Sequence, residues 1–253
     1  MRKFLSILTV GMLAATPALA GGYTAEQKRE IGQIVRQYLL QNPEILYEMQ
    51  DVLQRRQDMQ RIAHAESAFG DLFKPKPLDP VVGAKNGKKV LIEFFDYNCG
   101  FCKRMLPMLR KLVKEDPEVM VILKEFPILS DRTEGGSKEA SLAALAVHRL
   151  YPDKYWEFHS KLLGFQGIAN GKVALKIARQ MGLDTKRIEE EMKKSELEQA
   201  LQNNEILGQL LGIRGTPAFV TSARQVIPGA VDYRSLVAAL NKRDEKKAAA
   251  ARQ

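Results

Sequence analysis

The chain has 253 residues, of which 45% are hydrophobic and 27% are charged, and its formal net charge is +9 at pH 7. This length is sufficient for one ordinary hydrophobic core with an additional segment. The sequence holds only two cysteines, which excludes a disulfide-rich scaffold and a four-sulfur zinc site built from one chain.

The N-terminus has the pattern of a secretory signal peptide. Arg2 and Lys3 supply the charged start, an apolar run covers residues 4–15, and a small-residue cleavage pattern ends at Ala20. We therefore expect residues 1–20 to be removed and the mature protein to be exported. The alternative, a retained membrane anchor, is disfavoured because the run is short. Loss of the two basic residues lowers the charge from +9 to +7. We attribute the remaining positive charge to a need for solubility and expect no nucleic-acid partner.

Residues 21–77 are predicted to form a helical arm. Thr24 and Gln27 have the spacing of a capping box. A second predicted helix has Ile45, Val52 and Met59 seven residues apart, which is typical of a helix–helix seam. We expect this arm to be an oligomerisation region that makes the protein a homo-oligomer; the alternative is a helical arm that lies on its own domain. The apolar residues at helical spacing in the first helix are Ile31, Ile34, Val35, Tyr38 and Leu39.

A single domain is predicted for residues 78–242, after a Lys-Pro-Lys-Pro linker. Its order is strand, helix, strand, long helical block, two strands and a helix, and the tail 243–253 is expected to be flexible. The ranges are strands at 79–83, 90–95, 119–126, 218–221 and 225–231, helices at 99–114 and 233–242, and a helical insertion at about 130–214.

The two cysteines form the motif Cys99-Gly100-Phe101-Cys102 at a predicted strand-to-helix junction. A pair this close closes a very small loop and is therefore a poor structural staple, so the alternative of an inert short-loop disulfide is disfavoured. We expect a dithiol that cycles between reduced and disulfide forms. Cys99 at the helix start is favoured as a thiolate nucleophile, and Cys102, one turn into the helix, is the expected resolving thiol.

Three separated motifs agree in type and order with one family. They are the cysteine motif preceded by Glu93-Phe94-Phe95-Asp96-Tyr97-Asn98, the proline at 107 five residues past the second cysteine, and the segment Gly215-Thr216-Pro217-Ala218-Phe219. The domain resembles the DsbA-like thiol:disulfide oxidoreductases of the thioredoxin superfamily. The preceding helices are similar to those of its oligomeric subgroup that includes suppressor-of-copper-sensitivity protein C. The resemblance implies an α/β thioredoxin fold with a helical insertion, preceded by an N-terminal helical arm.

This resemblance also implies roles for the residues around the cysteines. Pro217 is expected in a cis-proline loop that faces the cysteines, and the backbone of Thr216 is expected to pair with substrate; the alternative is an ordinary trans proline. Gly100 and Phe101 are the positions that tune the dithiol. A glycine followed by an aromatic residue, together with Thr216, resembles the isomerase members rather than the disulfide-donating oxidases.

Glu93 is an unusual residue in a strand of buried type, because a buried carboxylate needs a partner or a raised pKa. The resemblance places an acidic residue beneath the active site at this position, where it relays a proton to or from Cys102 through water. Lys124, in the neighbouring predicted strand, is its expected ion partner. The alternative is an edge position with Glu93 in solvent.

The sequence therefore predicts a periplasmic protein disulfide oxidoreductase that favours isomerisation or reduction. Its expected partners are unfolded or misoxidised exported proteins and a membrane redox partner that resets the dithiol. No cofactor is expected, and His64, His148 and His159 lack the spacing of a metal site. The alternatives are a monomeric disulfide-donating oxidase, a copper-binding periplasmic protein whose two thiolates suit Cu(I), and a chaperone-like binder that depends on the arm.

Overall fold

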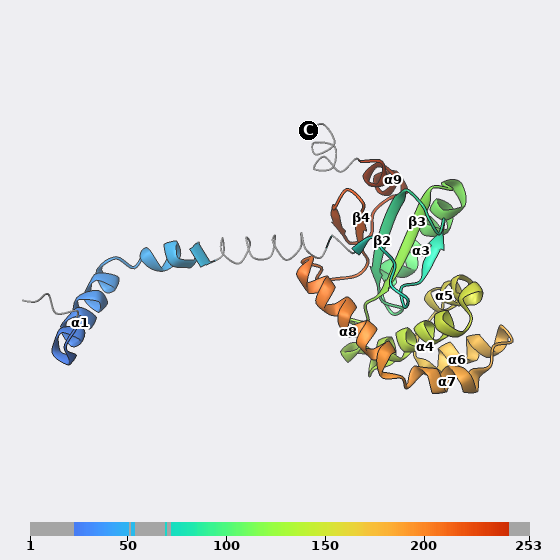
Figure 1. Ribbon diagram of the computed structural model, residues 1–253, viewed down its shortest axis with the longest axis horizontal. Helices are drawn as coiled ribbons and strands as arrows, with labels where there is room; N and C mark the ends of the chain where they lie inside the picture. Colours follow the sequence, from blue (N-terminus) through green and yellow to red (C-terminus); the bar gives the residue numbers. More distant parts are fainter. Residues whose placement is uncertain (1–22, 51, 54–68, 70–71, 243–253) are drawn as a thin grey trace, which may run out of the picture. The chain divides into compact units, whose positions relative to one another are not determined.

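A computed structural model describes residues 23–50, 52–53, 69 and 72–242 (Figure 1). The chain divides into two compact units, residues 1–57 and residues 58–253, and each is described by itself. The predicted signal peptide, the part of the second arm helix that contains Met59, His64 and the predicted tail lie outside the described residues.

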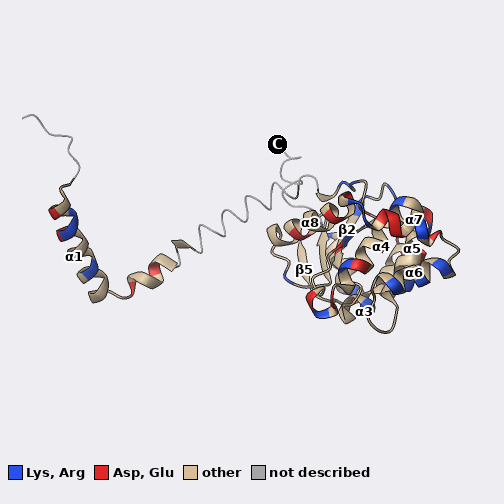
Figure 2. Ribbon diagram, turned by 90° about the horizontal axis from the view of Figure 1, so that it is seen from below, with Lys and Arg blue, Asp and Glu red and all other residues tan. Residues whose placement is uncertain are grey.

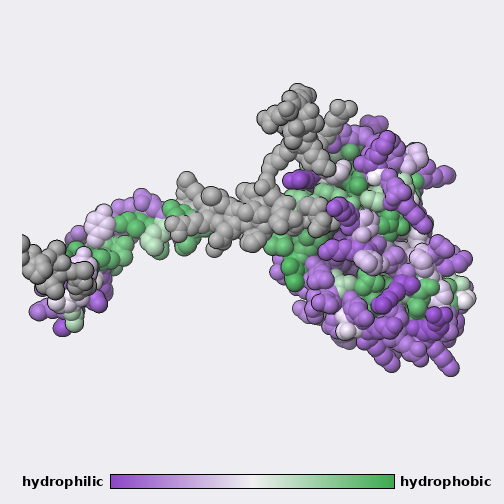
Figure 3. All heavy atoms as spheres, in the orientation of Figure 1, coloured by the Kyte–Doolittle hydropathy of each residue, from purple (hydrophilic) through white to green (hydrophobic). Residues whose placement is uncertain are grey.

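The first unit contains helix α1, Ala25–Gln41. The predicted capping box begins this helix: the Thr24 hydroxyl accepts from the Gln27 N–H at 3.2 Å, and the Gln27 carboxamide accepts from the Thr24 N–H at 2.9 Å. A second helical stretch covers residues 45–50 and 52–53. None of the residues of α1 is buried, and Figure 3 shows hydrophobic side chains along the described part of the arm. The exposed apolar residues include Ile31, Ile34, Val35, Tyr38, Leu39 and Leu40.

The second unit is built on a mixed five-stranded sheet, as the thioredoxin fold requires. The strand order is β1-β3-β2-β4-β5, so β2 is central. β2 and β3 are parallel, whereas the other three neighbouring pairs are antiparallel. The strands are β1 Val81–Gly83, β2 Lys89–Phe95, β3 Val119–Glu125, β4 Ala218–Thr221 and β5 Val226–Pro228.

Helices surround this sheet, and the predicted insertion is helical as expected (Figure 1). Figure 2 shows basic residues on α6 and both basic and acidic residues on α7, which is typical of solvated helix faces. None of the helices in the described part of the chain has the length and apolar character needed to cross a membrane. The helices are α3 Gly100–Glu115, α4 Gly136–Leu150, α5 Tyr155–Leu163, α6 Gly171–Gln180, α7 Thr185–Met192, α8 Ser195–Leu210 and α9 Tyr233–Asn241, with short 3₁₀ helices at Asp131–Thr133 and Pro152–Lys154.

The alternation of side chains along the strands produces two cores. Leu91 and Phe95 of β2 belong to the larger core, with residues of α3, of α9 and of the insertion helices. Ile92 and Phe94 belong to the smaller core. Leu72 is 5% exposed within that smaller core, so the compact unit begins before residue 78, the predicted start of the domain. The predicted linker therefore lies inside this unit, because apolar residues that precede it pack on the sheet.

A buried ion pair joins β3 to the segment before β1. The Lys124 Nζ contacts both carboxylate oxygens of Asp79 at 2.6 Å, and the two side chains are 4% and 8% exposed. Burial lowers the pKa of Lys124, and the Asp79 charge opposes that shift. Removing one member of such a pair leaves an uncompensated buried charge, which is far more costly than the loss of a surface ion pair.

We predict that Asp79→Asn lowers the free energy of unfolding by about 3 kcal/mol, because Lys124 loses its buried counter-charge. Urea unfolding followed by circular dichroism would measure this loss. Glu157→Gln removes the exposed Lys161–Glu157 pair and serves as the control, with an expected loss below about 0.5 kcal/mol. Equal losses for the two variants would contradict the role given to the buried pair.

Candidate active site

The cysteine motif lies where the central strand meets a helix, as predicted. β2 ends at Phe95, and Cys99 is the N-cap of α3 with φ −78° and ψ 115°. Both cysteines are free thiols; Cys99 is 7% exposed and Cys102 is fully buried. The sulfur of Cys99 therefore lies at the unpaired N–H groups of a helix start, and both cysteines pack in the larger core, where Cys102 has no exposed surface.

Hydrogen bonds from the insertion fix the loop between β2 and Cys99. The buried carboxylate of Asp96 accepts from the Ser137 hydroxyl at 2.8 Å and from the Leu129 N–H at 2.9 Å. The Asn98 side chain exchanges two hydrogen bonds with the backbone of Ala169, at 2.7 and 2.9 Å. These two polar residues were not predicted as site residues. The sequence signal available was a polar stretch placed directly between a buried strand and a cysteine.

The first turn of α3 is held by the insertion as well. The Lys103 Nζ donates to the carbonyls of Phe165 and Gly167 at 2.7 and 3.2 Å, and this lysine was not predicted as a site residue. Phe101 is 54% exposed, and the Arg104 guanidinium lies 4.2 Å from the centre of its ring. The tuning positions Gly100 and Phe101 thus carry an apolar ring and no titrating group.

The Thr216–Pro217 loop lies against Cys99, and its peptide bond is cis. The protonated Cys99 Sγ donates to the Thr216 carbonyl at 3.1 Å, across 117 residues of sequence. The carbonyl of Pro217, in turn, accepts from the Gly229 N–H at 2.8 Å. The structure therefore brings together four predicted site residues in one place: Cys99, Gly100, Thr216 and Pro217.

The two thiols have opposite acidities. The pKa of Cys99 is lowered to about 5, chiefly by a hydrogen bond from the Cys102 thiol and further by hydrogen bonds from the Thr216 side chain and from the backbone N–H groups of Cys102 and Phe101. The pKa of Cys102 is strongly raised, first by burial, then by its hydrogen bond to Cys99 and by the charge of Glu93. At neutral pH the reduced site therefore holds a Cys99 thiolate and a Cys102 thiol.

Glu93 is fully buried on the central strand, so the alternative of a solvent-exposed edge position is wrong. Neither carboxyl oxygen of Glu93 has a hydrogen-bond partner among the described residues. Burial raises its pKa to about 8, and the negative charge of Cys99 adds to that shift. Glu93 is thus a carboxyl group that holds a proton at neutral pH near the two sulfurs.

Lys124 is not the ion partner of Glu93, and that prediction is wrong. In the parallel β2–β3 register Glu93 lies opposite Leu123, while Lys124 lies opposite Phe94. Because side chains alternate along a strand, Glu93 and Lys124 point to opposite faces of the sheet. Lys124 pairs with Asp79 on the smaller-core side, and no contact joins it to the cysteines in the part of the chain that the structure describes.

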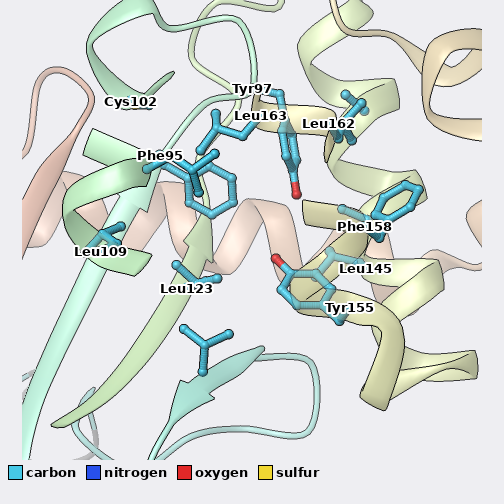
Figure 4. Packing of buried hydrophobic residues seen from close by; sticks show 14 of the residues in the cluster. Phe95, Tyr97, Cys102, Leu109, Leu123, Leu145, Tyr155, Phe158, Leu162 and Leu163 are labelled. Carbon is cyan, nitrogen blue, oxygen red and sulfur yellow. The ribbon is translucent and has the colours of Figure 1, made fainter. Parts of the chain in front are cut away.

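A second buried carboxyl, Glu125, was missed in the sequence. Its oxygens accept from the Ser141 hydroxyl at 2.8 Å, from Tyr97 at 3.2 Å and from Tyr155 at 3.3 Å. The Tyr97 hydroxyl also lies 3.0 Å from the His159 Nδ1, and Figure 4 shows the hydroxyls of Tyr97 and Tyr155 pointing toward one another. Burial raises the pKa of Glu125 to about 8 and lowers that of His159 to about 3.

A groove with a volume of about 520 Å³ opens beside Cys99. Cys99 and Thr216 line it together with the apolar residues Phe126, Ile128 and Ile213. Within the described residues, three or more His, Cys, Asp or Glu side chains nowhere cluster in a way that would hold a metal ion. The arrangement thus combines a thiolate, a second thiol and an open surface for a polypeptide.

Because the pKa of Glu93 is about 8 in the fold and 4.5 ordinarily, the unfolded chain ionises first as the pH rises. The free energy of unfolding then falls between pH 4.5 and pH 8, by roughly 1.4 kcal/mol per pH unit. We predict that Glu93→Gln removes this contribution, so its stability relative to the parent protein increases from pH 5 to pH 8. Urea unfolding of both reduced proteins at several pH values would measure the difference, and a constant difference would contradict the prediction.

Comparisons with known proteins agree with this geometry. Residues 90–241 match the family model of the DSBA-like thioredoxin domain, and residues 27–60 match that of the copper resistance protein ScsC N-terminal domain. A crystal structure of a thioredoxin-like oxidoreductase from Silicibacter pomeroyi is 37% identical, with a TM-score of 0.62, and the match covers 68% of this chain and 95% of that one. A linker-deletion mutant of Proteus mirabilis ScsC is 31% identical, with a TM-score of 0.61, over 87% of this chain and 96% of that one.

Among curated proteins, disulfide bond formation protein D of Bacillus subtilis is 27% identical over 61% of this chain and 72% of its own length. A match to the Na⁺/H⁺ antiporter NhaA 3 of Salinispora tropica is 24% identical over 59% of this chain, but it spans only 23% of the antiporter. The thioredoxin-domain match covers more than half of the chain. This protein therefore belongs to the DsbA-like family of thiol:disulfide oxidoreductases, with an N-terminal segment similar to that of ScsC.

Proposed function

We propose that this protein is an exported, periplasmic thiol:disulfide oxidoreductase that isomerises or reduces wrong disulfides in exported proteins. The observation that carries the proposal is the exposed apolar stripe of α1, which is attached to a domain whose reduced dithiol is stabilised as a thiolate. Self-association of the stripe would place several reduced active sites around one substrate protein.

The chemistry begins with the Cys99 thiolate. Its sulfur attacks one sulfur of a substrate disulfide, the substrate S–S bond breaks, and the other substrate sulfur leaves as a thiolate that takes up a proton. In isomerisation, a different substrate thiolate then attacks the mixed disulfide, forms a new substrate disulfide and returns Cys99 as a thiolate. In reduction, Cys102 attacks the Cys99 sulfur instead, so the substrate gains two electrons and a Cys99–Cys102 disulfide forms.

Glu93 supports the second route as a proton acceptor for Cys102 once it has released its own proton. The Cys102 thiol must lose its proton before it attacks, and its buried setting opposes this loss. Formation of the mixed disulfide removes the Cys99 charge, which is one of the causes that raise the pKa of Glu93. Glu93 therefore becomes easier to ionise at the step in which Cys102 needs a base, and a water molecule would carry the proton between them.

Oligomerisation through the arm explains why large apolar side chains remain exposed. Ile34, Val35 and Tyr38 are 66%, 49% and 58% exposed, and such a row along one helix face is typical of an interaction surface. The match of residues 27–60 to the ScsC N-terminal domain supports the same assignment. The partners proposed are therefore a second copy of this chain and misoxidised exported proteins, with a membrane redox partner that returns the dithiol to its reduced form.

We predict that Ile34→Glu with Tyr38→Glu yields a monomer that no longer rescues a scrambled-disulfide substrate in its reduced form. The reason is that two buried charges at the interface prevent association. Sedimentation equilibrium would give the oligomeric state, and recovery of substrate activity would give the isomerisation rate, which should fall about tenfold or more.

The matched control is Gln33→Glu with Gln37→Glu, which adds the same two charges at the same spacing on the other side of α1. This control should keep both the oligomer and the rescue. A monomeric double variant that rescues as well as the parent protein would contradict the link between the arm and isomerisation. Failure of the reduced parent protein to rescue any scrambled substrate would contradict isomerisation itself.

We further predict that Glu93→Gln slows the Cys102-dependent release of substrate from the mixed disulfide by about a hundredfold at pH 7, since a glutamine accepts no proton. Rapid-quench measurement of a single turnover would give this rate. Glu125→Gln removes another buried carboxyl group and is the control, with a rate close to that of the parent protein. An unchanged rate in Glu93→Gln would eliminate the proton relay.

A further inference from the structure

The groove beside Cys99 has a basic wall. Arg132 and Arg214 both line it, together with the apolar residues. Arg132 lies in the 3₁₀ helix that follows β3, and Arg214 lies two residues before Thr216. Both side chains therefore lie on the surface that a substrate segment would cover when its sulfur reaches Cys99.

Among the described residues, neither arginine has a charged partner. Both residues are exposed, and no ion pair to a carboxylate is found for either of them within the described part of the chain. The acidic side chain on the same groove is Glu205, which accepts a long hydrogen bond from Gln209 at 3.5 Å. Two of the charged side chains that line the groove are thus basic and one is acidic, and the Cys99 thiolate adds a second negative charge in the reduced protein.

The arginines are also not required to explain the thiolate. The lowered pKa of Cys99 follows from hydrogen bonds with Cys102 and Thr216 and with the backbone at the start of α3. Two guanidinium groups beside a reactive sulfur, free of partners in the described residues, are suited to carboxylates of a bound chain, because a guanidinium matches a carboxylate with two parallel hydrogen bonds.

We propose that Arg132 and Arg214 select substrate segments that carry an acidic residue close to the reacting cysteine. This inference rests on the proposed function and names the class of segment that the same site prefers. Apolar side chains of that segment would lie on Ile128, which is 40% exposed, and on Phe126 and Ile213. Because the groove is open to solvent, the preference acts mainly on the rate of association and decreases with salt.

Three peptides would test this proposal. Each contains one cysteine, which forms a mixed disulfide with mercaptoethanol. The residues two positions before and two positions after this cysteine are both Glu in the first peptide, both Gln in the second and both Lys in the third. The reduced protein converts each to the free peptide thiol and mercaptoethanol, while Cys99 and Cys102 become a disulfide. We expect the Glu peptide to react about three to ten times faster than the Lys peptide at low salt, with a ratio near one at 0.5 M NaCl.

Arg132→Gln with Arg214→Gln should bring that ratio close to one at low salt. The matched control, Arg179→Gln with Arg234→Gln, removes the same charge from exposed positions on α6 and α9 and should keep the ratio. Equal alkylation of all three proteins by uncharged iodoacetamide would show that Cys99 itself is unchanged.

A ratio near one in the parent protein would overturn the inference and leave the proposed function intact. The same conclusion follows if the control lowers the ratio as much as the groove variant does, since the preference would then come from overall charge. If none of the three peptides reacts, the proposed function fails and this inference fails with it.

Discussion

The chemistry of this protein depends on the hydrogen bonds that hold the loop before Cys99. Asp96 and Asn98 bind the insertion through Ser137 and Ala169, and together they set where α3 begins. With the start of α3 fixed, the Cys99 sulfur lies at the free N–H groups of the first turn and within reach of the Thr216 carbonyl. The insertion is therefore part of the active site, because the thioredoxin core alone does not supply these contacts.

The sheet separates two kinds of buried charge. On one face, Lys124 and Asp79 neutralise each other in an ion pair that links β3 to the segment before β1. On the other face, Glu93 and Glu125 are held without a counter-ion among the described residues, so burial raises the pKa of both to about 8. Charge pairing stabilises Lys124 and Asp79, whereas Glu93 and Glu125 hold their protons at neutral pH. Strand alternation explains why Lys124 cannot serve Glu93 although their strands are neighbours.

Much of this arrangement could be predicted from the sequence, because it depends on local pattern. The apolar run before Cys99 predicts β2, and the capping pair Thr24 and Gln27 predicts the start of α1; both are confirmed. The errors concern pairing between distant segments. The register that places Lys124 opposite Phe94 cannot be predicted from the sequence of either strand alone. Likewise, the buried network around Glu125 needs side chains from α4 and α5. The spacing of apolar residues does not specify how these two helices pack on β3.

The low pKa of Cys99 does not by itself decide whether the protein oxidises or reduces its substrates. A thiolate with a pKa of about 5 stabilises the reduced dithiol relative to its disulfide. The disulfide form then gives up its bond readily, which suits an oxidase, while the reduced form persists, which suits an isomerase. The same stabilisation thus suits both activities, and the state that accumulates depends on whether the pair is oxidised or reduced faster. We propose that features outside the motif, above all the exposed stripe of α1 and the basic groove wall, determine which proteins meet that thiolate.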